Sequence, residues 1–263
     1  MTSREAAQIS AQESWDTTPP KKPKNKSRRA KNSPVPASSP ERPPSNNDAN
    51  ITPTLLRLTY SSHLPMAAKA PLRLLVCSIG NPAPYLQTYH SAGHLVVSAL
   101  QRSLAYPPFQ KSRAHGNGLV SEGLTPDGAR YTLWQSASLM NISGPGVVAA
   151  WRTFLKSSGG GTGEDARLVV VHDELELALG QVRVKKGEMS AKGHNGLKSI
   201  KESMANTGHE WWRIGVGIGR PLSREKDDVA RFVLSKMKDG DRERVLGCVG
   251  KVEVELGRLA TGG

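Results

Sequence analysis

The chain has 263 residues, with 36 lysines and arginines against 23 aspartates and glutamates, which gives a formal charge of +13. Its apolar runs, such as residues 74–77 and 168–171, are far shorter than the roughly 20 residues of a membrane-spanning helix, so we expect no membrane association. Cys77 and Cys248 lack the spacing typical of a disulfide framework or a structural zinc site, which favours a reducing, intracellular environment.

The first 70 residues are predicted to be a disordered, basic tail rich in Pro and Ser. They hold ten of the 18 prolines, and a segment of this composition cannot bury enough apolar surface to become ordered. Seven of the 11 residues from 21 to 31 are basic, as in a nuclear localisation signal, a nucleic-acid-binding arm or a solvated charge run. Early acidic residues (Glu5, Glu13 and Asp16) argue against a transit peptide, and cytoplasm and mitochondrion both stay open as locations.

Residues 71–263 are predicted to form one α/β domain. Buried strands are expected at residues 72–77, 131–135, 168–171 and 214–218, and a partly exposed strand at 181–185. Apolar residues at helical spacing predict helices over residues 92–104, after 146, over 197–204 and over 245–259. This alternation predicts a mixed, mostly parallel sheet with helices on both faces. The domain has 25 basic and 18 acidic residues, and its charge of +7 favours a polyanionic partner.

Polar residues follow the predicted strands at the edge where sheets of this kind bind ligands. Asn81 and His90 follow the first strand, Asn141 follows the second, and Asp173 follows the third. Asn195 stands at the start of the short helix. A titratable base, a carboxylate that can orient it, and amides that can hold a carbonyl group or a water molecule together indicate general-base chemistry.

Other interpretations of these residues are less favoured. His90 and His94 are spaced i, i+4 like a pair of metal ligands, but no Glu follows in the zincin pattern and no third ligand is evident. Asp173 and Glu174 could suggest paired glycosidase carboxylates, but adjacent residues on a strand face opposite ways. The histidines beside these motifs are predicted to be structural: His172 and His194.

Several short segments resemble, in order, the motifs of bacterial-type peptidyl-tRNA hydrolases. They are SIGNP at 78–82, YHSAG at 89–93, MNISG at 140–144, HDEL at 172–175, GHNGLK at 193–198 and RIGVG at 213–217. The resemblance covers roughly residues 72–260. It implies that residues 71–263 are a catalytic domain that hydrolyses the ester between a peptide and tRNA, recycling tRNA from prematurely released chains. No metal or cofactor is implied, and we expect a monomer.

The resemblance also implies roles for individual residues. The catalytic group comprises a general base, its carboxylate partner and an amide: His90, Asp173 and Asn81. Residues matched to the substrate site are Asn141, Asn195, Met140 and Tyr85. Cations matched to tRNA phosphates are Arg183, Lys185 and Arg213.

The chain departs from the family pattern in its loops. Ala83 stands where a Gly is usual, and Ser91 where an Asn usually follows the catalytic His. Residues 136–138 replace a Lys-Pro pair, and residues 188–192 replace a glycine-rich segment. None of these changes removes a proposed chemical group. The alternative hypothesis is a non-catalytic RNA-binding module that retains the same fold.

Overall fold

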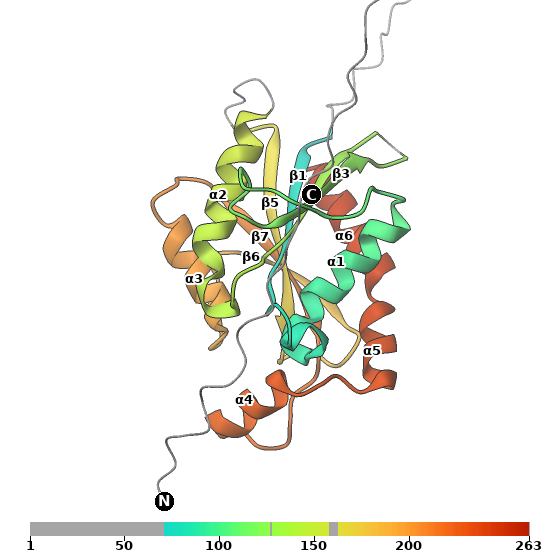
Figure 1. Ribbon diagram of the computed structural model, residues 1–263, viewed down its shortest axis with the longest axis vertical. Helices are drawn as coiled ribbons and strands as arrows, with labels where there is room; N and C mark the ends of the chain where they lie inside the picture. The colour runs from blue at the N-terminus through green and yellow to red at the C-terminus, as the bar shows by residue number, and fades with distance from the viewer. Residues whose placement is uncertain (1–70, 127, 158–162, 263) are drawn as a thin grey trace, which may run out of the picture. The chain divides into compact units, whose positions relative to one another are not determined.

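The computed structural model describes residues 71–126, 128–157 and 163–262. The predicted tail, residues 1–70, and its basic run at 21–31 lie outside the described residues. The described part is an α/β domain with helices on both faces of a mixed sheet (Figure 1), which confirms the predicted fold class. No helix in that part combines the length and the apolar character that a membrane span requires.

The described residues form a seven-stranded sheet with the order β2-β3-β4-β1-β5-β7-β6. Its strands are β1 (Arg73–Ser78), β2 (Gln110–Lys111), β3 (Leu119–Leu124), β4 (Arg130–Gln135), β5 (Ala166–Glu174), β6 (Val182–Lys186) and β7 (Trp211–Gly217). The four central strands β4, β1, β5 and β7 are parallel, and the edge strands pair antiparallel. Strand β1 lies between β4 and β5, so the chain after β1 first adds β4 on one side and then adds β5 on the other. Sheets of this kind bind ligands at the carboxyl end of the strand where the order changes side, which here is β1.

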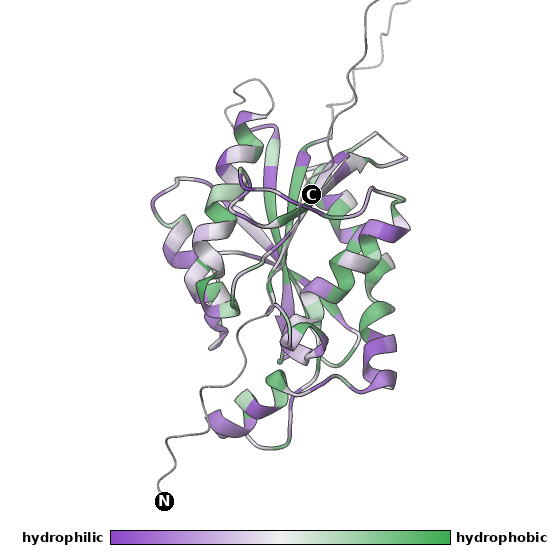
Figure 2. Ribbon diagram, viewed as in Figure 1, coloured by the Kyte–Doolittle hydropathy of each residue, from purple (hydrophilic) through white to green (hydrophobic). Residues whose placement is uncertain are grey.

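The central strands are buried on both faces, which explains their continuous apolar sequences. In β1, Leu74 and Val76 belong to one hydrophobic cluster, whereas Leu75 and Cys77 belong to the other. The helices over the first cluster are α1 (Ala92–Ser103), α5 (Asp239–Leu246) and α6 (Val249–Ala260), and those over the second are α2 (Ser143–Lys156) and α3 (Asn195–Met204). Figure 2 shows α6 as largely hydrophobic and α5 as mostly hydrophilic, so α6 provides more of the apolar contact than α5 does.

One more helix, α4 (Lys226–Leu234), lies beyond the carboxyl ends of the parallel strands (Figure 1). Val233 is its only fully buried residue. The helix is held by the ring of Phe232, which stacks on Tyr89 with 4.5 Å between ring centroids. Tyr89 belongs to the 3₁₀ turn η2 (Tyr89–Ser91) after β1. Helix α4 is therefore attached directly next to His90.

The structure corrects the predicted secondary structure in three places. The single C-terminal helix expected over 245–259 is wrong, because α5 ends at Leu246 and α6 begins at Val249. The hairpin of β2 and β3 was not predicted, and Gly123 interrupts the apolar alternation of β3 where the ring of Tyr106 packs against it. Helix α4 was also missed, because it is only nine residues long and its apolar face consists of little more than Val229, Phe232 and Val233.

Helix α1 lies directly against the carboxyl ends of β1 and β5 because Gly93 has no side chain. A Cβ atom at this position would lie 2.5 Å from the carbonyl oxygen of Val171 and 2.9 Å from that of Ile79. Both obstacles are backbone atoms of the sheet, which cannot turn aside as a flexible side chain can. The close approach brings the residues before α1, His90 among them, to the end of β5.

The two helical glycines Gly93 and Gly257 are expected to respond oppositely to alanine. Gly93→Ala should lower the free energy of unfolding by about 1–3 kcal/mol, because the methyl group overpacks the contact between α1 and the sheet. Gly257→Ala on α6, where a Cβ meets nothing within 4 Å, should raise it by about 0.5–1 kcal/mol. Urea denaturation of the two variants checks this, and equal stability of both would contradict the proposed packing constraint.

Candidate active site

Asp173 and His90 form the centre of the site. β5 continues for three residues beyond its pairing with β1, which ends at Val171. His90, from the turn after β1, lies beside this extension, with Nδ1 2.9 Å from Oδ1 and 3.0 Å from Oδ2 of Asp173. The Asp173 side chain is 1% exposed and that of His90 is 15% exposed. The carboxylate is therefore buried, whereas the imidazole reaches the surface.

The charge of Asp173 determines which nitrogen of His90 carries the proton. Burial alone raises the pKa of Asp173, but the electrostatic attraction and hydrogen bonds of His90 and His194 together hold it well below its usual range. An ionised carboxylate only accepts hydrogen bonds, so Nδ1 of His90 donates and Nε2 keeps its lone pair in the neutral ring. Burial lowers the pKa of His90, yet the charge and hydrogen bond of Asp173 outweigh this effect and raise the pKa overall.

His194 is a second imidazole at this carboxylate, although the sequence predicted a structural role for it. Its Nε2 lies 3.1 Å from Oδ1 of Asp173, and its Nδ1 accepts a hydrogen bond of 3.3 Å from the backbone N–H of Leu197. His194 thus caps α3 and holds Asp173 at the same time. Its position before a predicted helix, at the carboxyl edge of the sheet, is the signal in the sequence that points to this contact.

The potential ligand atoms of His90, Asp173 and His194 lie within 4.8 Å of one another, the one group among the described residues that is compact enough to hold a metal ion. The donor chemistry favours hydrogen bonds over coordination. Because Nδ1 of His194 accepts the N–H of Leu197, its proton resides on Nε2, where a metal would need the lone pair. The expectation that no metal takes part stays a prediction.

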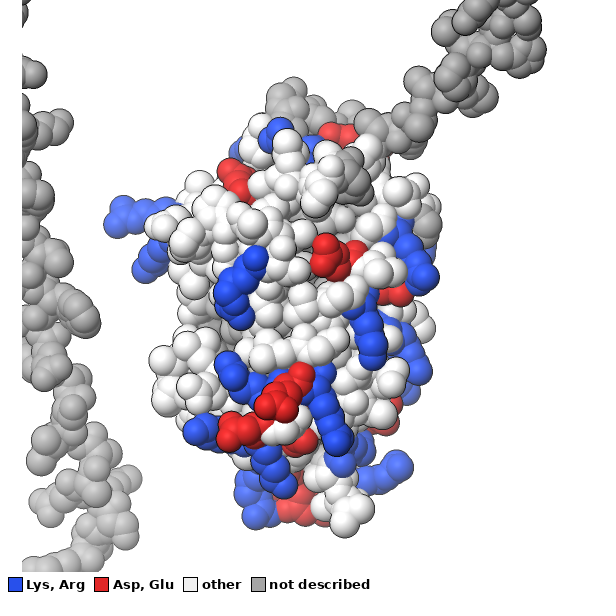
Figure 3. Space-filling model, turned by 90° about the vertical axis from the view of Figure 1, so that its right-hand side faces the viewer, with Lys and Arg blue, Asp and Glu red and all other residues white. Residues whose placement is uncertain are grey.

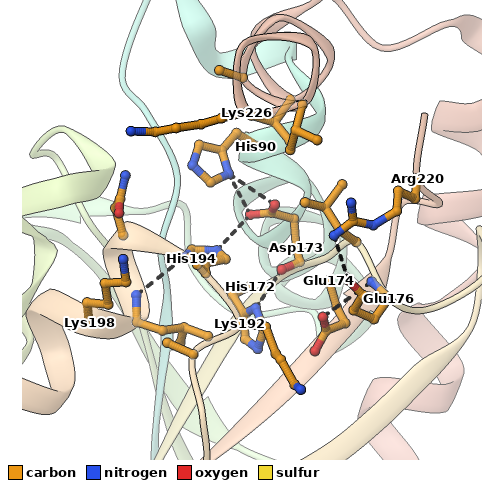
Figure 4. A pocket seen from close by; sticks show the side chains of 18 of the residues that line it. His90, His172, Asp173, Glu174, Glu176, Lys192, His194, Lys198, Arg220 and Lys226 are labelled. Atoms are coloured by element: carbon orange, nitrogen blue, oxygen red, sulfur yellow. Dashed lines mark hydrogen bonds and ion pairs between the residues drawn. The ribbon is translucent and has the colours of Figure 1, made fainter. Parts of the chain in front are cut away.

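A pocket of about 490 Å³ opens over this group. Figure 4 shows His90 above Asp173, with His194 on the other side of the carboxylate and Lys226 of α4 beyond His90. Apolar parts of α4 line the pocket together with the first turn of α3, including the predicted residue Asn195. His172 lies behind Asp173, and burial above all lowers its pKa to about 3, so its ring is neutral.

The predicted catalytic residue Asn81 and the other predicted substrate residues lie outside this pocket lining. Asn81 is buried, and its side-chain oxygen accepts a hydrogen bond of 2.8 Å from the backbone N–H of Met140, which leaves the amide nitrogen as a donor. Asn141 and Tyr85 are exposed. Met140 offers little side-chain surface to a substrate, because it is 3% exposed and packs against Gly196.

The three predicted phosphate ligands differ in their surroundings. Arg183 is exposed on β6. Lys185 on β6 forms an ion pair of 2.8 Å with Glu174 on β5. The pair spans the strand between them, β7, at Gly215, where the missing side chain leaves room for Glu174. Arg213 needs correction, because it is 2% exposed and donates to the carbonyl groups of Met189 and Ser190, so it holds the segment before α3 and presents no charge to solvent.

The structure adds cations to the three that the resemblance matches to phosphates, and some of them depend on α4 and on the path of the segment before it. The pocket is lined by Lys192, Lys198, Arg220, Arg224 and Lys226. Of these, Arg220 is paired with Glu176 at 2.7 Å, as Figure 4 shows. In Figure 3, basic and acidic side chains are interspersed at the end that carries α4 and α5. That end of the molecule is therefore a mixed charged surface.

Comparison with known proteins gives a consistent match. A family model described as peptidyl-tRNA hydrolase matches residues 75–262. The peptidyl-tRNA hydrolase of Leptothrix cholodnii is 39% identical over 179 residues, 68% of this chain and 76% of that protein. That of Frankia casuarinae is 40% identical over 173 residues, 65% and 79% of the two chains. A crystal structure of the enzyme from Acinetobacter baumannii matches with a TM-score of 0.57 and 28% identity, covering 73% of this chain and 89% of that one.

Asp173→Asn should lower the pKa of His90 below its ordinary value, because the carboxylate that raises this pKa is lost while the burial that lowers it remains. NMR titration of the His90 ring measures the shift. The matched control is Glu176→Gln, which removes a carboxylate from the same pocket but one that faces Arg220. The pKa of His90 should not move in that variant, and a shift of similar size in both variants would refute the direct pairing.

Proposed function

The chain belongs to the peptidyl-tRNA hydrolase family, and we propose that His90 and Asp173 carry its reaction. The enzyme hydrolyses the ester that joins the C-terminal carboxyl group of a peptide to the 3′ ribose of tRNA, which recycles tRNA from prematurely released chains. The observation that carries the proposal is the orientation of His90. Its Nδ1 donates to a buried carboxylate, so the basic Nε2 is the nitrogen left for a water molecule in the pocket.

The proposed reaction begins with His90 as a general base. Nε2 takes a proton from the water while the water oxygen attacks the ester carbonyl, which gives a tetrahedral oxyanion and an imidazolium. The buried charge of Asp173 stabilises that imidazolium. The oxyanion then collapses, the bond to the ribose 3′ oxygen breaks, and the imidazolium returns its proton to that oxygen. Free peptide acid and free tRNA leave, and His90 is neutral again.

We assign supporting roles to the amides and to His194. Asn81, with its oxygen held by the backbone of residue 140, offers N–H groups to the oxyanion or to the water, and Asn195 at the pocket does the same. Asn141 and Tyr85 are proposed to contact the ends of the substrate. His194 is a positioning residue, because it acts on Asp173 and thereby on His90.

For the RNA part of the substrate, we propose that exposed cations bind phosphates. Arg183 is exposed, and Lys185 can exchange Glu174 for a phosphate oxygen. Lys192, Lys198 and Lys226 at the pocket extend this set. The domain is proposed to act as a monomer in the cytoplasm or the mitochondrion, where peptidyl-tRNA arises.

His90→Ala should reduce release of N-acetylaminoacyl groups from tRNA by about 10²- to 10⁴-fold, the usual contribution of a general base, while tRNA binding is retained. Radiolabelled substrate measures release. The control is His209→Ala, whose ring packs edge-on against Trp151 and which lies just before the amino end of β7, at the end of the sheet away from the site. In the wild type, kcat/KM should fall as the pH drops through the raised pKa of His90, since the protonated ring is no base. Binding without release by the wild type would instead support an RNA-binding module.

Arg183→Gln should weaken tRNA binding and reduce the slope of log K against log salt by about one, as expected for one lost phosphate contact. Filter binding at several salt concentrations gives this slope. Lys111→Gln on β2, an exposed cation at the opposite edge of the sheet, serves as the control. An unchanged slope for Arg183→Gln would refute the phosphate contact.

A further inference from the structure

Two segments beside the site carry no formal charge. The chain has no Asp, Glu, Lys or Arg from Leu74 to Gln101, and none from Tyr131 to Trp151. These stretches contain the turns after β1 and the 3₁₀ turn η3 (Met140–Ile142) after β4. We call residues 79–89 and 136–145 the uncharged wall. The pocket lining from α3, α4 and the segments that lead to them, in contrast, includes several lysines and arginines.

The two parts of the uncharged wall are hydrogen-bonded to each other and to elements that border the site. The side-chain oxygen of Asn81 accepts the backbone N–H of Met140. The hydroxyl group of Ser91, next to His90, donates to the carbonyl oxygen of Tyr85 at 2.8 Å. The backbone N–H of Gly144 donates to Ser199 on α3 at 3.0 Å. The wall is thus tied to the residue beside the proposed base and to the helix that His194 caps.

Aliphatic side chains are exposed on this wall. Leu139 is 49% exposed and Ile142 is 54% exposed, and the exposed substrate residue Asn141 stands between them in the chain. In the family that the chain resembles, a Lys-Pro pair precedes this turn, whereas residues 136–138 here are Ser-Ala-Ser. The wall therefore presents apolar side chains with no cation that could attract RNA.

The two halves of the substrate differ in the same way as the two sides of the site. The RNA carries a negative charge on each phosphate, which suits the lysines and arginines near α3 and α4. The peptide carries none of these charges. We propose that the uncharged wall binds the last residues of the peptide, and that Leu139 and Ile142 make the enzyme prefer apolar side chains there. This inference rests on the proposed function and names a specificity within it.

The test compares two substrates on one and the same tRNA, N-acetyl-Leu-Leu-tRNA and N-acetyl-Asn-Asn-tRNA. Leu and Asn are similar in size and uncharged, so the comparison isolates apolar contact, and rates are corrected for uncatalysed hydrolysis. Wild-type kcat/KM should be about tenfold or more higher for the Leu-Leu substrate, the discrimination typical of small apolar contacts in a binding site. The double variant Leu139→Asn/Ile142→Asn should hydrolyse both substrates at nearly equal rates.

The control is Leu124→Asn/Val254→Asn, which alters two residues that are as exposed, at 59% and 56%, but lie on β3 and α6. It should keep the preference of the wild type. Equal wild-type rates on the two substrates would overturn the specificity and leave the proposed function intact. An equal loss on both substrates in the Leu139/Ile142 variant would also overturn it, because it would assign these residues to the RNA end. No hydrolysis of either substrate would refute the proposed function itself.

Discussion

The site depends on one buried carboxylate. A charge in the position of Asp173 is costly to remove from water unless donors surround it, and here two imidazoles supply them. The need for these donors determines how the surrounding strand and helices are placed. β5 has to extend past β1 to carry the carboxylate, α1 has to approach closely enough at Gly93 to bring His90 beside it, and α3 has to begin at His194. The same contacts that satisfy the charge fix the proton on His90.

The surroundings of this carboxylate are electrostatically asymmetric. The segments after β1 and β4 contain no charged residues, whereas those leading to α3 and α4 contain many. In the proposed complex, this asymmetry would favour one orientation of a substrate that is polyanionic at one end and peptide at the other. The local sequence of each loop determines whether that loop is charged. The fold then places the charged and the uncharged loops around a single edge of the sheet.

Much of this arrangement is predictable from the sequence. The strands with continuous apolar runs, and the pairing of His90 with Asp173, follow from periodicity and from the resemblance of short motifs, and the structure places these residues together. What could not be predicted depends on tertiary contacts. Arg213 looks like a surface cation in the sequence, but its place on a central strand buries it against backbone carbonyl groups. Met140 is drawn into the core because Gly196 opposite it leaves space. Helix α4 is a short segment with a narrow apolar face, and only its contact with the turn after β1 brings Lys226 to the pocket.

The pairing of Lys185 with Glu174 bears on how the enzyme releases its product. Free tRNA has the same phosphates as peptidyl-tRNA, so contacts to phosphate alone hold the two equally well and slow turnover if they are strong. A lysine that already has an internal carboxylate at 2.8 Å gains little by exchanging it for a phosphate, because one anion replaces another. In the proposed complex, Glu174 would then compete with RNA for Lys185. Discrimination between peptidyl-tRNA and free tRNA would then depend on contacts with the peptide, because only the substrate carries a peptide.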